Sequence, residues 1–217
     1  MVDYKVWFTA DLHINHNNIL AHQSSRVDKM GLLDKNDIIH HDEFIINKWL
    51  EQTNKNDHIY VLGDMIMGNA EYSYKILNIL KSNGCKIHLI VGNHDKSTQK
   101  MYNMFESIDL IKNVTFHKNV FPFLKEDFQV VMCHYPMKSW SCKCKGSVNL
   151  YGHVHDNSPW LNDSDDLALN VGIDSPFSNY ELISLEKVYN WYLEKLNGMT
   201  PREYIDFCSK KNNNFVR

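Results

Sequence analysis

Five short apolar runs along the chain each end at a side chain of the kind that binds metal ions. The runs are rich in valine, isoleucine and aromatic residues, which is typical of buried strands. They cover residues 6–10, 59–63, 87–92, 130–133 and 148–152, and the residues that follow them are Asp11, Asp64, Asn93, His134 and His153. Because sites in α/β folds assemble outside the carboxyl ends of the strands, the pattern predicts one polar, metal-binding site at a sheet edge.

Between and after these runs, the spacing of apolar positions changes to the helical period. It predicts helices over residues 37–53, 71–83, 96–106 and 184–196. Gly84 is expected to cap the second of them. A capping box that begins at Thr200, with Pro201 at the first helical position, predicts a last short helix before a frayed tail.

The second half of the chain is richer in strand patterns than the first. Strands are expected over residues 114–117, 128–133, 147–151 and 167–171, whereas the segment from the end of the first strand to Met30 and residues 157–166 are expected to be loops. Strands that alternate with helices and then follow one another predict an α/β fold with antiparallel strands in the second half.

Composition narrows the class of protein further. The 217 residues suit a single domain, and the net charge of −3 argues against an extended nucleic-acid surface, since only Lys138, Lys143 and Lys145 form a small basic cluster. No apolar run has the length of a membrane span. The odd number of cysteines, five, and the lack of a secretion-type start favour a reducing, cytoplasmic location.

The spacing of the polar residues suggests shared ligands. Asp11 and His13, like His153 and His155, are two positions apart, so an extended backbone would turn both side chains to one face. Residues 92–95, Gly-Asn-His-Asp, place three polar side chains in one turn. Each motif alone is more often structural than functional, but their joint occurrence at strand ends favours a site.

The chemistry of the ligand set points to two ions. Two aspartates, four histidines and one asparagine, without cysteine, suit Mn, Fe, Zn or Co. They exceed the needs of one ion, and a shared carboxylate that holds two ions about 3.5–4 Å apart uses them economically. The remaining histidines lack this context and are expected at the surface or in the core: His22, His40, His41, His58, His88 and His117.

In this order, the motifs resemble those of the calcineurin-like metallophosphoesterase superfamily. The series comprises Asp11-x-His13, Gly63-Asp64, Gly92-Asn93-His94-Asp95, His134 and Gly152-His153-x-His155. A closer likeness, to a compact bacterial and phage-associated branch, rests on His16, Asn18, Asp42-Glu43, Trp49, His134-Tyr135-Pro136, Trp140 and the Asn170–Asp174 segment.

The resemblance implies a fold and a set of roles. The fold would be a four-layer α/β/β/α sandwich of two mixed sheets flanked by helices, formed as a single domain by residues 1–217. One ion would be held by Asp11, His13, Asp64 and His155, and the other by Asp64, Asn93, His134 and His153. Asp64 would bridge the ions, and Asp95 would orient His94, which is not itself a ligand.

The implied reaction is the hydrolysis of a phosphoester. Two divalent ions, with Mn²⁺ favoured over Fe, Zn, Co or Ni, would lower the pKa of a bridging water and clamp the phosphoryl oxygens. The resulting hydroxide would attack phosphorus in line with the leaving oxygen. His94 is the expected acid for that oxygen, because imidazole titrates near neutrality.

The expected substrate is a small phosphodiester such as a nucleotide. Protein phosphatases of the superfamily continue the second motif with Asp-Arg-Gly, but Asp64 is followed by Met-Ile-Met, so the arginine that would grip a monoester dianion is missing. His16, Asn18 and Arg26 are candidate substrate contacts, with loop packing as the alternative. Tyr135 and Trp140 could stack on a base, although core packing is favoured for both. The other hypotheses are a nucleotide or protein phosphomonoesterase, a nuclease and a catalytically silent scaffold.

Overall fold

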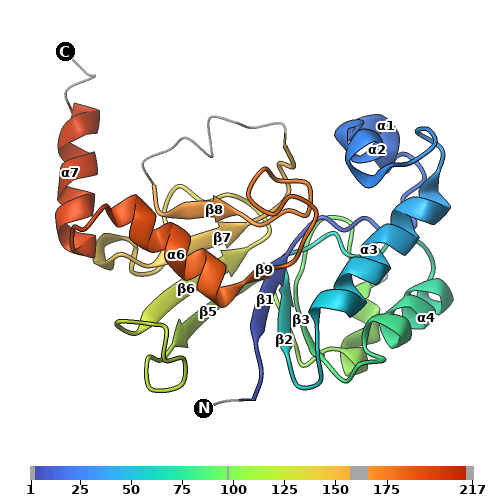
Figure 1. The fold of residues 1–217 in the computed structure, drawn as a ribbon, viewed down its shortest axis with the longest axis horizontal. Coiled ribbons are helices and arrows are strands. Elements are labelled where there is room, and N and C mark those ends of the chain that lie inside the picture. The colour runs from blue at the N-terminus through green and yellow to red at the C-terminus, as the bar shows by residue number, and fades with distance from the viewer. Residues whose placement is uncertain (1–2, 97, 157–165, 214–217) are drawn as a thin grey trace.

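The structure is a computed structural model, and it describes residues 3–96, 98–156 and 166–213. Two β-sheets pack face to face at its centre, and helices flank them (Figure 1). The strands of the first sheet are, in spatial order, β4 (Ser107–Asp109), β3 (Lys86–Ile90), β2 (His58–Val61), β1 (Val6–Thr9) and β9 (Ile183–Ser184). Those of the second are β5 (Ile111–Phe116), β6 (Phe128–Cys133), β7 (Val148–Tyr151) and β8 (Ala168–Asn170).

Both sheets are mixed. In the first, β1, β2, β3 and β4 run parallel, and β9 pairs antiparallel with β1. In the second, β6, β7 and β8 run parallel, and β5 pairs antiparallel with β6. The predicted α/β fold is confirmed, and antiparallel pairing does occur in the second half, but most pairs in both sheets are parallel.

Alternate positions of the first sheet face different layers. Trp7, Ile59 and Val61 belong to one core cluster, which also contains residues of two helices, α3 (Ile38–Gln52) and α4 (Ala70–Leu80). The next residues along the same strands, Phe8, Tyr60 and Leu62, belong to the other cluster, together with the second sheet and α6 (Leu185–Leu196). Since successive side chains of a strand point to opposite faces, the first sheet is covered on both sides, which gives the four layers.

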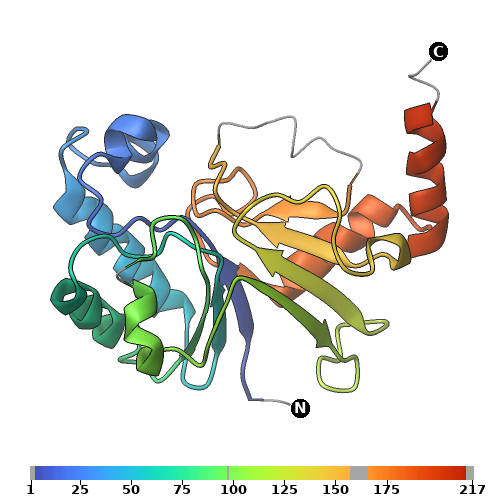
Figure 2. The same ribbon diagram turned by 180° about the vertical axis from the view of Figure 1, so that it is seen from behind.

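The helix ends follow local sequence signals. The side-chain oxygen of Asn69 accepts the Tyr72 backbone N–H at the start of α4, and that of Ser184 accepts the Lys187 N–H at the start of α6. The predicted capping box at α7 (Pro201–Asn213) is confirmed by reciprocal hydrogen bonds between Thr200 and Glu203. That helix is longer than expected and includes part of the predicted tail; Figure 2 shows it standing at the far edge of the molecule.

Several elements differ from the sequence prediction. The helix predicted to residue 83 ends at Leu80, and Gly84, at φ 83°, lies in the following turn rather than at the helix cap. The third predicted helix is a 3₁₀ helix, η1 (Thr98–Met104). The expected first loop contains two short helices, α1 (Ile19–His22) and α2 (Ser25–Met30). The predicted loop at 157–166 lies, except for its last residue, outside the described residues.

The topology brings distant segments to one edge. The carboxyl ends of β1, β2 and β3 point the same way in the first sheet, and those of β6 and β7 do so in the second. A parallel bridge between Ala10 and Gly172 joins the two sheets at the end of β1. The residues that follow these five strands therefore meet in the space between the sheet ends.

Candidate metal centre

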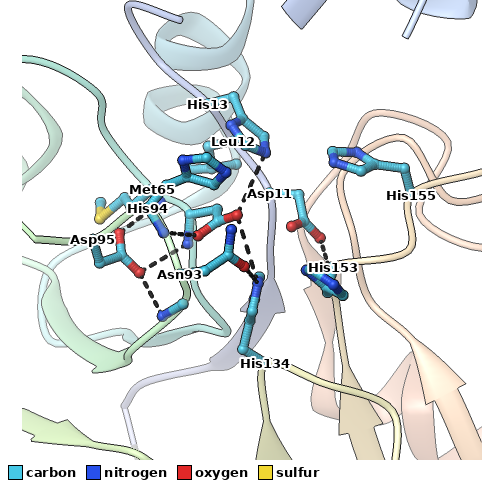
Figure 3. Close-up of polar contacts among 12 residues, drawn as sticks. Asp11, Leu12, His13, Met65, Asn93, His94, Asp95, His134, His153 and His155 are labelled. Carbon is cyan, nitrogen blue, oxygen red and sulfur yellow. Dashed lines mark hydrogen bonds and ion pairs between the residues drawn. The ribbon is translucent and has the colours of Figure 1, made fainter. Parts of the chain in front are cut away.

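Two groups of potential ligands lie side by side at this edge (Figure 3). We call Asp11, His13 and His155 the first cluster, and Asp64, His134 and His153 the second cluster. Within each cluster, one ligand atom from every residue lies within 4.8 Å of the others. The structure thus brings together six of the seven side chains predicted to bind metal, and Asn93 adjoins the second cluster.

Asp64 belongs to the second cluster but also faces the first. Its Oδ2 is 3.7 Å from Nε2 of His13 and 3.5 Å from Nε2 of His134. Its Oδ1 accepts a hydrogen bond of 2.8 Å from the backbone N–H of His94, which fixes the rotation of the carboxylate. One oxygen of Asp64 therefore faces both clusters, as a bridging ligand would.

The backbone at the ligand positions is not extended. Five residues of the two clusters have positive φ: Asp11 (57°), His13 (51°), Asp64 (53°), His153 (71°) and His155 (52°). The expected extended Asp-x-His and His-x-His geometry is therefore wrong, although the side chains still converge. A left-handed conformation costs a non-glycine residue about 1–2 kcal/mol, and such strain concentrates at functional sites. Backbone hydrogen bonds from Asp11 to Gly63 and from His13 to Asp64 hold the first turn in place.

Two glycines leave room for this convergence. A Cβ atom at Gly63, where φ is 90°, would overlap the His134 ring, and one at Gly92 would overlap Oδ1 of Asp64. At Gly92, whose φ is not positive, the lack of a side chain and not a left-handed backbone is what the packing requires. The loops after β2 and β3 pack so closely that only glycine fits between them.

Asp95 has a different task from the one expected. Its Oδ2 accepts the backbone N–H groups of Asp64 and Gly92, each at 2.8 Å, and its Oδ1 accepts that of Met65 at 3.0 Å. Among the described residues, these backbone groups, and not the His94 ring, are its hydrogen-bond partners. Asp95 therefore ties the two ligand loops together, and the exposed imidazole of His94 lies beside the rings of His13 and His16.

His134 presents a lone pair to the site. Its Nδ1 lies 2.7 Å from the carbonyl oxygen of Leu62 and must donate to it, so Nε2 of the neutral ring carries the lone pair. That nitrogen is 3.0 Å from Oδ1 of Asn93, which is also an acceptor. A cation placed between these two groups would bind both of them.

The first cluster also contains buried polar atoms that lack partners. Oδ1 of Asp11 and both ring nitrogens of His13 make no hydrogen bond with the described residues. Burial raises the pKa of Asp11 to about 7, and burial followed by the charge of Arg26 lowers the pKa of His13. An ionised carboxylate needs a cation here, and a neutral imidazole is the form that binds one, so the donor set fits a divalent metal ion.

The three candidate substrate contacts have different positions. The His16 ring stacks on His13 with centroids 5.1 Å apart and lies 6.0 Å from the His94 ring, so it borders the site. Asn18 is exposed just before α1. Arg26 is 0% exposed and lies beneath the first cluster, so the expectation that it touches substrate is not supported by its position.

The two candidate stacking residues also differ. Trp140 is buried, and its Nε1 donates to the carbonyl of Ser147, as the core-packing interpretation predicted. Tyr135 is 44% exposed, its ring centroid lies 4.6 Å from that of His153, and its hydroxyl group is 3.4 Å from Oδ1 of Asn93. The core-packing prediction for Tyr135 is therefore wrong, and this ring flanks the second cluster.

Asp174 is a contact of the site that the motif analysis left without a role. It follows β8, and its Oδ2 lies 2.8 Å from Nδ1 of His155. The same layout of an apolar run followed by a carboxylate, seen in residues 167–174, was the signal that could have found it. The six other histidines are at the surface or in the core, as predicted, but buried His41 contacts Arg26 at 3.0 Å.

Within the described part of the chain, no helix combines the length and the apolar character that crossing a membrane requires. No disulfide joins the described cysteines. Cys142 and Cys144 flank Lys143 at the short helix η2 (Lys143–Lys145), and neither cysteine belongs to a metal-type cluster among the described residues.

Comparison with known proteins supports this picture. The model of the calcineurin-like phosphoesterase family matches residues 4–197. Gene 66 protein of Mycobacterium phage D29 is 24% identical over 199 residues, which cover 84% of this chain and 93% of the phage protein. The uncharacterized protein MJ1445 of Methanocaldococcus jannaschii is 25% identical over 190 residues, with 85% and 89% coverage. The crystal structure of AQ665 from Aquifex aeolicus, a protein of unknown function, has a TM-score of 0.64 at 18% identity and covers 87% of this chain and 100% of its own, so it shares the fold.

Proposed function

The chain belongs to the calcineurin-like phosphoesterase family, whose members hydrolyse phosphoesters with metal ions, and we propose that its substrate is a small phosphodiester such as a nucleotide. The observation that carries a two-ion reaction is the position of Asp64. Its Oδ2 lies within 3.7 Å of a ligand nitrogen in each cluster, so one carboxylate serves both. When bound, two divalent ions would lower the pKa of a water molecule and neutralise phosphoryl charge.

The proposed ligand sets follow the two clusters. The first ion is held by Asp11, His13 and His155 together with Asp64. The second is held by His134 and His153 together with Asp64 and Asn93. Oxygen and imidazole donors without thiolate suit Mn²⁺, which is the ion we propose, while Fe, Zn, Co and Ni remain compatible with the same donors.

His94 is the proposed acid for the leaving oxygen. Its side chain is exposed, and its ring centroid lies 5.7 Å from that of His13, so it borders the first cluster without belonging to it. The hydrogen bond from its backbone to Asp64 fixes its distance from the bridging carboxylate. A proton donated from this ring would neutralise the charge that develops on the leaving group.

The proposed preference for a diester rests on the lack of an accessible positive charge at three positions near the site. Met65 and Ile66, which follow the bridging aspartate, are fully buried, and so is the Arg26 guanidinium. None of these three positions offers the bidentate, charge-assisted contact that favours a phosphomonoester dianion. A diester carries one negative charge less, and the exposed face of Tyr135 beside the second cluster offers a surface for a base or similar ring.

A comparison of two esters with one leaving group tests this proposal. We expect a higher kcat/KM on a nitrophenyl phosphodiester than on nitrophenyl phosphate, measured with the same Mn²⁺ concentration and pH. A broader screen of nucleotide diesters and monoesters, with products identified, then defines the natural class. A clear preference for the monoester would contradict the diesterase proposal and leave the two-ion site intact.

We also propose a cytoplasmic location. Cys144 is exposed and Cys142 is partly exposed, and neither belongs to a disulfide in the structure. A reducing compartment preserves such thiols.

A further inference from the structure

Arg26 is a fully buried charge whose hydrogen-bonding capacity is completely used. It lies on α2, and its side chain is inaccessible to solvent. Nε and Nη2 donate to Oδ2 of Asp174 at 3.0 and 2.7 Å. Nη2 also donates to the carbonyl of Asp11 at 2.7 Å, and Nη1 donates to that of Leu12 at 3.2 Å and contacts His41 Nε2 at 3.0 Å. These contacts account for all five N–H donors of a guanidinium.

Two of these contacts hold the strained turn of the first cluster. The carbonyl groups of Asp11 and Leu12 lie within the turn in which Asp11 and His13 both have positive φ. Asp11 and His13 are the two first-cluster residues that follow β1. Because a left-handed turn needs surrounding contacts to persist, Arg26 stabilises the backbone from which both side chains project.

A third contact reaches the remaining member of the first cluster. Oδ2 of Asp174 accepts from Arg26 and also lies 2.8 Å from Nδ1 of His155. The carboxylate oxygen can only accept, so His155 carries its proton on Nδ1 and its Nε2 lone pair is left for a metal ion. Arg26 therefore positions His155 through Asp174, which is 148 residues away in the chain.

The Arg26 guanidinium is itself held in place by His41. An arginine is always protonated, so Nε2 of His41 must accept from it, and Nδ1 of His41 must then donate to Oδ1 of Asp42 at 2.8 Å. Oδ2 of Asp42 accepts the backbone N–H of Asn15 at 2.8 Å. The hydrogen bonds run without a break from Asn15 to His155, and every donor in the path has a partner.

We propose that Arg26 is a positioning residue that organises the first of the two metal sites and not the second. It contacts the carbonyl of Asp11, the carbonyl of Leu12 just before His13, and the carboxylate that supports His155. In the second cluster, the carbonyl of Leu62 holds the His134 ring and the carboxylate of Asp95 holds the Asp64 backbone, and Arg26 contacts neither residue. One backbone contact, from the His153 N–H to Oδ2 of Asp11, joins the two clusters. The inference rests on the metal ligands of the proposed function, but it does not depend on which ester is cleaved.

Metal binding to the stripped full-length chain, measured by titration calorimetry with Mn²⁺ alone, tests the proposal without an activity assay. The wild-type chain should bind two ions. Arg26→Met should weaken one of them by about 10–100-fold, the usual effect of losing a residue that supports a ligand, and should leave the other unchanged. Equal weakening of both ions, or of neither, would overturn the proposal. A wild-type chain that binds fewer than two ions would instead contradict the proposed function.

Two backgrounds identify which ion is affected. In a His153→Ala chain, which retains the first cluster, adding Arg26→Met should weaken the remaining ion by the same factor of about 10–100 as in the wild-type chain. In a His155→Ala chain, whose first cluster is already broken, it should add little to the loss. The opposite pattern would assign Arg26 to the second site and would refute the inference.

A conservative variant separates geometry from charge and also covers the case in which Arg26→Met does not fold. Arg26→Lys keeps the positive charge but has a single nitrogen, which cannot reach Asp174, the two carbonyls and His41 together. We expect it to restore only part of the lost affinity. Full restoration would mean that charge, and not the guanidinium fork, is what the site requires.

A matched pair of aspartate variants controls for general destabilisation. Asp174→Asn should weaken the first ion. Asp57 is an equally buried carboxylate at the other end of the first sheet, where it accepts from Lys5, Trp7 and Asn54. Asp57→Asn should lower the melting temperature but leave both Mn²⁺ affinities unchanged. Similar losses of affinity in the two variants would show that any buried defect weakens the site.

Discussion

The two ligand clusters lie at the same sheet edge but are supported in different ways. In the first cluster, Asp11 and His13 are 0% and 3% exposed, and His155 is backed by the buried ion pair of Asp174 and Arg26. In the second, the His134 ring is held by a neutral carbonyl, and His153 is exposed. Asp64 and His134 are as buried as Asp11 and His13, so the second position differs from the first by opening to solvent at His153.

This difference suggests that the two metal positions have different roles. A buried, charge-supported site keeps its geometry when solvent or substrate changes, because buried hydrogen bonds such as those of Arg26 to Asp11 and of His155 to Asp174 hold its backbone and side chains. The open site has the exposed side chains of Asn93 and Tyr135 beside it, so it is where a bulky substituent of the substrate has room. We therefore expect the first ion to be an anchor and the second to exchange more readily.

The largest effect should come from removing the group that the clusters share. Asp64→Asn replaces the charged bridge with a neutral amide, so we expect loss of activity and weaker binding of both ions. The measurement is metal content and turnover of the purified variant. Two tightly bound ions and normal turnover would rule out a bridging role for Asp64.

The next largest effect should come from the residue that borders the clusters without joining them. His94→Ala should keep both ions but lose about 10²–10⁴-fold in turnover on esters with poor leaving groups, which need a proton most. Nitrophenyl esters, whose leaving group is already a good one, should lose much less. The same loss on both kinds of ester would argue against His94 as the acid.

The sequence predicted the positions of these residues better than their supports. Each ligand follows an apolar strand in the chain, so its place at a sheet edge could be inferred from local pattern alone. The support of His155 could not, because Arg26 and Asp174 are 148 residues apart and are brought together by the tertiary fold. Arg26 looked like a loop residue near the first motif, and only the structure shows that its side chain is fully buried.

The fold shows the same division between local and non-local information. The α3 helix and the strand β6 have strong periodic patterns, and both were predicted to within one residue. The helices α1 and α2 were missed because four and six residues are too few to show a period. The left-handed backbone of the ligand turns was also missed, since it is imposed by packing against the neighbouring loops.

A pair of histidine variants compares the two clusters directly. His155→Ala and His153→Ala should each remove one ion, but their effects on the metal-free protein should differ. Loss of the His155 ring deprives the buried Asp174 of a donor, which should cost about 1–2 kcal/mol of stability. Loss of the exposed His153 ring should cost less than about 0.5 kcal/mol. Chemical unfolding of both metal-free variants checks this, and equal costs would contradict the contrast between a buried and an open site.

The smallest expected effect comes from His88, which lies outside both clusters. Its titration has to be known before the pH dependence of the two clusters can be compared. Nδ1 of His58 lies 2.9 Å from Nε2 of His88, and burial, followed by the charges of His58 and Lys112, lowers the pKa of His88 to about 4. The unfolded chain, in which histidine titrates near 6.5, therefore takes up the proton first. Stability from this residue is present above about pH 6.5 and is lost as the pH falls toward 4.

Between pH 7 and pH 5, the wild type should consequently lose about 1 kcal/mol more stability than the His88→Gln variant. This value is reduced for partial solvent screening of the ring. Urea unfolding of the metal-free wild type and variant at pH 7 and pH 5 gives the two slopes. The dependence of the unfolding free energy on pH that remains in the variant includes the titration of the two clusters but no longer that of His88. An unchanged slope would mean that His88 titrates normally, and the acid sensitivity of the metal-free protein would then have to arise elsewhere, including in the two clusters themselves.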